Sequence, residues 1–76
     1  MNIGFYTVNT KEEIFSGEFP SMEKAYEAVE EYFGEMAQAE GDNDLTSLTI
    51  TQKRPKVWLI TNFGTGGTYL LYIKQT

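Results

Sequence analysis

The segment from Ser21 to Glu40, SMEKAYEAVEEYFGEMAQAE, constrains the fold most, because it alone has sustained helical periodicity. Its apolar residues recur at spacings of three and four, which places them in one stripe of a helix. These residues are Met22, Ala25, Tyr26, Val29, Tyr32, Phe33 and Met36. Ser21 after Pro20 is a typical N-cap, and Gly41 is a typical left-handed C-cap. The sequence therefore predicts a helix over about residues 21–40.

The other apolar segments have the composition of strands. They are rich in β-branched and aromatic residues and are separated by turn formers, and they cover about residues 2–9, 14–19, 45–53, 57–63 and 68–75. Short connections between consecutive strands favour antiparallel pairing. The predicted fold class is α+β, a small single domain over residues 1–76 in the order ββαβββ. It has a mainly antiparallel five-stranded sheet and one amphipathic helix packed on a face.

The last two predicted strands are apolar on both faces, whereas one helix can cover only one of them. The sequence leaves open which face the helix covers. The other face requires a strongly curled sheet, a second subunit or a bound partner to shield it from water.

The composition excludes several classes of function. The chain has no Cys and no His, so we expect no soft-metal site, no metal ligands and no cofactor. No nucleophile stands beside a plausible base, and we therefore expect no catalytic residues and no enzyme activity. No segment approaches the length of a membrane span, and the N-terminal residues lack the pattern of a signal peptide. The expected location is the cytoplasm, without membrane association.

Charge is unevenly distributed along the chain. The net charge is −5, but residues 21–44 carry eight carboxylates against one Lys, whereas residues 45–76 carry four cations and no acid. An acidic protein is repelled by nucleic acid and attracted to basic surfaces. Direct binding to nucleic acid is therefore not expected.

The predicted helix concentrates its glutamates on one side. At 100° per residue they fall in a sector of about 140°, opposite the apolar stripe. The candidate partner-binding residues are Glu23, Glu27, Glu30, Glu31 and Glu35, with Asp42 just beyond the helix. Such a row can present spaced negative charge to a groove that normally receives nucleic-acid phosphates. It can also serve only to keep the surface solvated.

Small acidic α+β proteins of this kind resemble the inhibitors that phages and mobile elements encode against host defence or repair enzymes. The resemblance lies in size, charge and architecture, so it assigns no role to any residue. It implies a protein–protein interaction module that mimics nucleic acid and blocks a basic nucleic-acid-handling protein of the host.

Two alternatives use the basic C-terminal half of the chain. Aromatic and cationic side chains there can form a stacking platform for single-stranded nucleic acid, and the candidates are Lys53, Arg54, Lys56, Trp58 and Tyr72. The basic hairpin of one subunit can instead meet the acidic helix of another in a structural homodimer.

Overall fold

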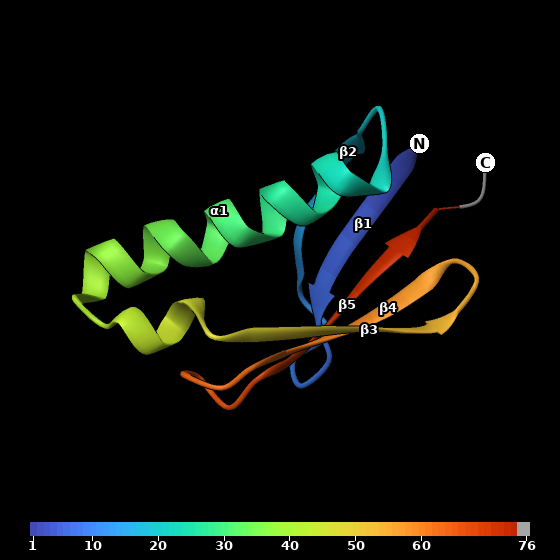
Figure 1. Cartoon of the computed structure of the whole chain (residues 1–76). Coiled ribbons are helices and arrows are strands. Elements are labelled where there is room, and N and C mark those ends of the chain that lie inside the picture. The colour runs from blue at the N-terminus through green and yellow to red at the C-terminus, as the bar shows by residue number, and fades with distance from the viewer. Residues whose placement is uncertain (75–76) are drawn as a thin grey trace.

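The computed structural model describes residues 1–74, which form a five-stranded sheet and one long helix (Figure 1). In chain order the elements are β1 (Asn2–Thr7), β2 (Glu13–Glu18), α1 (Met22–Glu40), the short 3-10 helix η1 (Asn43–Thr46), β3 (Leu48–Arg54), β4 (Val57–Asn62) and β5 (Thr68–Ile73). The predicted α+β class, the ββαβββ order and the antiparallel sheet are confirmed.

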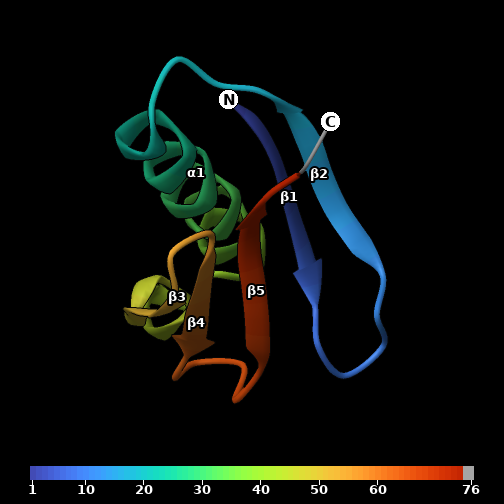
Figure 2. The ribbon, with the colours of Figure 1, turned by 90° about the vertical axis from the view of Figure 1, so that its right-hand side faces the viewer.

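The strands lie in the order β2-β1-β5-β4-β3, and every neighbouring pair is antiparallel. The N-terminal and C-terminal strands are therefore adjacent inside the sheet, with Phe5 opposite Leu71. β2 and β3 are the two edges, and Figure 2 shows β2 as the outermost strand on the side away from β3 and β4. The β1–β2 pairing contains a bulge, because Phe5 pairs with Phe15 and Tyr6 with Glu13.

α1 covers one face of the sheet (Figures 1 and 2). Apolar side chains at i, i+4 spacing make the buried stripe of the helix, which packs on alternate residues of β1, β4 and β5. The buried core comprises Ala25, Val29 and Phe33 of α1 with Ile3, Phe5, Trp58, Ile60, Tyr69 and Leu71 of the sheet. Aromatic rings meet edge to face at its centre, where Phe33 lies 5.0 Å from Tyr69.

Both predicted caps of the helix are present. The Ser21 hydroxyl accepts a hydrogen bond from the Lys24 amide at 3.3 Å. Gly41 has a φ of 68°, and its N–H donates to the Ala37 carbonyl.

The start of the third strand differs from the prediction. Leu45 was expected to begin a strand, but it is the buried residue of η1, and β3 starts at Leu48. Asp42 explains the difference, because its carboxylate accepts from the Asp44 amide at 3.0 Å and caps a 3-10 turn. The predicted last strand included Gln75, which lies outside the described residues.

Candidate partner-binding surface

Five glutamates of α1 lie on the side of the helix that faces away from the sheet. Every one of the five predicted contact residues of the helix is exposed: Glu23, Glu27, Glu30, Glu31 and Glu35. The buried stripe opposite them begins at Ala25 and ends at Ala37. The packing of α1 therefore places these carboxylates together on one surface, which we call the acidic face.

The spacing of the acidic face is regular. Glu23, Glu27, Glu31 and Glu35 recur every four residues, which is a rise of about 6 Å along the helix axis. Among the described residues, the ion pair on this face joins Lys24 Nζ to Glu27 Oε2 at 3.1 Å, and both side chains are more than half exposed. One cation therefore stands among five carboxylates, and the surface remains strongly negative.

Most charges of α1 are arranged against its stability, although Glu23 lies in the first turn, where the helix dipole favours a carboxylate. Glu27, Glu31 and Glu35 are i, i+4 neighbours of like charge, and each such pair costs a few tenths of a kcal/mol. The last turn has no basic residue, while Glu40 lies there beside the negative end of the helix dipole. The acidic face therefore does not stabilise the isolated fold.

Gly34 opens part of the acidic face. A β-carbon built on this residue meets no atom within 4 Å, so no neighbouring group requires glycine here. Glycine in a helix interior costs about 1 kcal/mol relative to alanine. The missing side chain leaves the helix backbone accessible between Glu30 and Glu35.

Asp42 has a structural role in addition to its predicted place at the end of the acidic face. Its carboxylate caps η1, so it is partly engaged by the Asp44 amide. Asp42 lies beyond Gly41, outside the regular repeat of the helix, and is peripheral to the acidic face.

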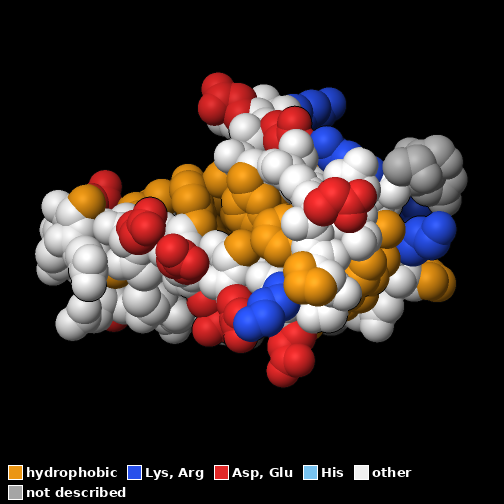
Figure 3. Space-filling view, turned by 90° about the horizontal axis from the view of Figure 1, so that it is seen from above, with side chains coloured by type: hydrophobic (Ala, Val, Ile, Leu, Met, Phe, Trp, Pro, Cys, Tyr) orange, Lys and Arg blue, Asp and Glu red, His pale blue; other side chains and the backbone are white. Residues whose placement is uncertain are grey.

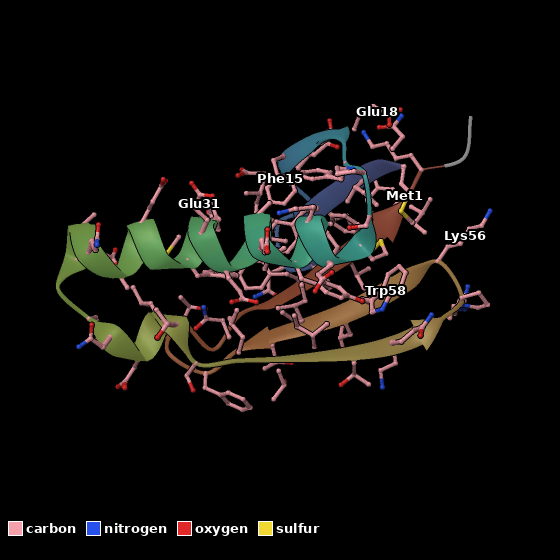
Figure 4. All side chains as sticks on the ribbon, turned by 45° about the horizontal axis from the view of Figure 1, so that its top comes forward. Met1, Phe15, Glu18, Glu31, Lys56 and Trp58 are labelled. Carbon is pink, nitrogen blue, oxygen red and sulfur yellow. The ribbon has the colours of Figure 1, made fainter. Side chains whose placement is uncertain are left out.

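The structure separates the two aromatic residues of the predicted stacking platform. Trp58 is only 7% exposed and lies in the core, where its ring is 6.3 Å from that of Tyr26 of α1 (Figure 4). Tyr72 lies on the opposite face of the sheet, because it follows Leu71, which pairs with Trp58. The two rings do not form one surface. The cations Lys53, Arg54 and Lys56 are exposed at and around the β3–β4 turn, and Figure 4 shows Lys56 at this turn.

Tyr72 instead belongs to the face of the sheet that α1 leaves uncovered. Its ring lies 5.6 Å from the Tyr6 ring in an edge-to-face contact. A groove of about 480 Å³ is lined there by Tyr6, Val8, Lys11, Glu13 and Tyr72. At its rim Lys74 Nζ lies 2.8 Å from Glu13 Oε1, and this hydrogen bond raises the pKa of Lys74.

Within residues 1–74, no three acidic side chains converge so that they could hold a metal ion. No helix of this part of the chain is both long and apolar enough to cross a membrane. Comparisons with protein-family models, curated proteins and solved structures find no match to this chain.

Proposed function

We propose that this protein is an interaction module that binds a basic, nucleic-acid-handling protein through its acidic face and blocks it by occupying the nucleic-acid site. The observation that carries this proposal is the row of exposed carboxylates on α1, which recurs every turn and contains a single cation. The proposal includes no catalytic step and no cofactor.

Geometry supports a phosphate-like role for these carboxylates. The repeat of about 6 Å along the helix axis places several negative charges within reach of neighbouring Lys and Arg side chains of a groove. The 19 residues of α1 extend for about 28 Å, so one helix can follow such a groove for most of its length. Glu27, Glu30, Glu31 and Glu35 are the central contacts, with Glu23 and Asp42 at the ends.

The energetic argument points in the same direction. Like-charge neighbours and an acidic C-terminal turn lower the stability of α1, as described above. Alternating Glu and Lys would also keep the surface solvated, and it would stabilise the helix where the all-Glu pattern destabilises it. The acidic face is therefore better explained by attraction to a basic partner than by solubility alone.

An affinity capture from nuclease-treated bacterial lysate tests this proposal. The bait is the full chain, and the test variant is Glu27→Lys/Glu31→Lys. A matched control, Glu12→Lys/Thr49→Lys/Thr51→Lys, gives the same net charge of −1 with substitutions outside α1. We expect the wild type and the control to recover a basic nucleic-acid-binding protein that the test variant loses. Equal recovery by all three would refute the role of the acidic face.

Self-association is a second candidate, favoured by the uncovered sheet face. Val57, Leu59 and Leu70 lie on this face with Tyr6 and Tyr72, and no element among residues 1–74 packs over them. A dimer formed there, or one that joins the basic β3–β4 turn to the acidic face, predicts twice the monomer mass of 8.7 kDa in light scattering. The hypothesis that the protein binds single-stranded nucleic acid predicts instead that it binds oligonucleotides in a salt-sensitive way. Such binding must use Tyr6 and Tyr72, because Trp58 is buried.

A further inference from the structure

β2 is an edge strand with unpaired backbone groups. Phe19 exchanges hydrogen bonds with Met1 at 2.8 Å on the β1 side, and the register continues this bonded series through Gly17 opposite Ile3. In an antiparallel ladder the intervening residues direct their N–H and C=O groups the other way. The backbone groups of Ser16 and Glu18 therefore face outward, where another strand can pair with them.

An apolar strip lies beside this edge, on the face that carries α1. It consists of side chains that pack on the core but are only partly buried: Ile14, Phe15, Phe19, Tyr32 and Met36. The Phe15 ring lies 5.0 Å from Phe5 and 5.9 Å from Phe19. Figure 4 shows Phe15 on β2, beside α1, and Figure 3 shows hydrophobic side chains gathered on this side of the molecule between acidic ones.

Carboxylates flank the edge on both faces of the sheet. On the α1 side, Glu35 is offset from Tyr32 by about 60° around the helix axis, which places it next to the strip. On the uncovered side, Glu13 and Glu18 project from β2 itself, since Glu13 pairs with Tyr6 and Glu18 with Asn2. Each of them already has a cation beside it: Lys74 Nζ lies 2.8 Å from Glu13, and the Met1 amino group lies 3.2 Å from Glu18, so a basic segment would share or replace these ion pairs. The other edge, β3, carries Lys53 and Arg54 instead. The two edges of the sheet are thus opposite in charge.

We propose that the β2 edge and the apolar strip bind an extended segment of the partner in which apolar residues alternate with Arg or Lys. The segment adds to β2 as a sixth strand, with its apolar side chains on the strip and its basic side chains opposite Glu13 and Glu18. This inference rests on the proposed function, from which it takes the basic character of the partner. It adds that an extended segment of the partner pairs with the backbone of β2.

Charge favours such a segment over a second copy of this chain. Pairing β2 with itself about Ser16 would place Ile14 opposite Glu18 and Glu13 opposite Phe19, and it would bring the carboxylates of both copies together. Like charges on neighbouring strands are destabilising, whereas opposite charges stabilise the pairing. A strand in which apolar and basic residues alternate avoids both the apolar residues opposite carboxylates and the contacts between like charges.

The test uses an eight-residue peptide of alternating Val and Arg with blocked ends, titrated into the full-length 15N-labelled protein. A second peptide has the same sequence, but the backbone amides that would face β2, on alternate residues, carry N-methyl groups and cannot donate hydrogen bonds. We expect amide shifts concentrated in residues 14–19 and at Tyr32, and at least tenfold weaker binding of the N-methylated peptide. Ser16→Pro, which removes an outward N–H without touching the β1 ladder, should weaken binding of the first peptide to a similar degree.

The outcomes separate this inference from the proposed function. Equal affinity for both peptides, shifts confined to α1, or no shift at millimolar peptide would overturn the strand pairing. The Glu27→Lys/Glu31→Lys variant provides the second arm, because its substitutions lie away from β2. If it loses the captured protein but still binds the Val-Arg peptide at β2, both proposals stand. If it keeps the captured protein while the peptide binds at β2, only the proposed function fails.

Discussion

Asn62 of β4 donates a hydrogen bond from Nδ2 to the carbonyl oxygen of Leu45 at 2.8 Å, and so fastens η1 to the sheet. Its Oδ1 accepts from the amides of Gly64 and Thr65 at 2.8 and 3.1 Å. Asn62 is fully buried, and within residues 1–74 it is the only polar residue that is buried. One side chain therefore positions both η1, which follows α1, and the β4–β5 loop.

Replacing Asn62 should be strongly destabilising. Asn62→Ala leaves the Leu45 carbonyl and two loop amides without their partner, at about 1–3 kcal/mol for each group that stays buried. We expect a lower denaturation midpoint in urea with an unchanged slope. Asn62→Asp keeps the acceptor but loses the donor, and should also destabilise the fold. A midpoint equal to that of the wild type would contradict this role.

Two glycines should respond differently to alanine. A β-carbon at Gly64 would lie 2.5 Å from the backbone oxygen of Asp44, whereas one at Gly4 would lie 2.5 Å from the end of the Tyr72 ring. Backbone cannot move aside without shifting η1, but the half-buried Tyr72 ring lies on the uncovered face of the sheet and can rotate away. Gly64→Ala should therefore cost about 1–3 kcal/mol, in the range of overpacking, and Gly4→Ala clearly less. Urea denaturation of both variants measures the difference, and the reverse order would contradict the account.

Charge reversal on the acidic face should stabilise the isolated protein. Glu31→Lys replaces two repulsive i, i+4 pairs, with Glu27 and Glu35, by two attractive ones. Each change is worth a few tenths of a kcal/mol, so the gain is on the order of 1 kcal/mol at low salt. Thermal unfolding should show a higher Tm that returns toward the wild-type value as salt rises. A lower Tm would mean that the acidic face stabilises the fold.

Stability should fall in alkaline solution partly because of Tyr32. Burial, with a smaller effect of Tyr69, raises the pKa of the Tyr32 hydroxyl above 10.0. Between the unfolded and folded pKa values, only the unfolded chain has released this proton, so rising pH favours unfolding. Tyr32→Phe should make the decline above about pH 10 shallower while changing little at pH 7. Denaturation midpoints between pH 8 and pH 11 provide the measurement, and an unchanged slope would contradict it.

Lys74 contributes to the same decline. Its hydrogen bond with Glu13 raises the pKa of its ammonium group above 10.5, and this stabilisation is present below that pH and lost as pH rises through the folded value. Lys74→Gln is therefore the control: its denaturation midpoints over the same pH range show how much of the decline is due to Lys74 and how much to Tyr32.

The helix could be predicted from sequence because its signals are local. Ser21, Gly41 and the apolar repeat between them depend on neighbouring residues, and the structure confirms both caps. The acidic side of α1 follows from the same repeat, so the exposure of its glutamates was predictable as well. Whether that face binds a partner is a separate question, which the experiments above address.

The features that the sequence did not reveal depend on contacts between distant segments. Both parities of β4 and β5 are apolar, so only the docking of α1 decides that Trp58 is buried and Tyr72 is not. The 3-10 turn before β3 is capped locally by Asp42, but its attachment to the sheet depends on Asn62, seventeen residues after Leu45. The apolar strip beside β2 arises because β2 lies at an edge, which the order of elements along the chain does not specify.

The most direct test of binding through the acidic face is the association rate with the captured partner, measured across a range of salt concentrations. Electrostatic steering by the acidic face predicts a rate that falls steeply between about 50 and 500 mM salt, a large loss of this dependence in Glu27→Lys/Glu31→Lys, and competition by DNA. A rate that is independent of salt, or that is the same for this variant and the Glu12→Lys/Thr49→Lys/Thr51→Lys control, would contradict it.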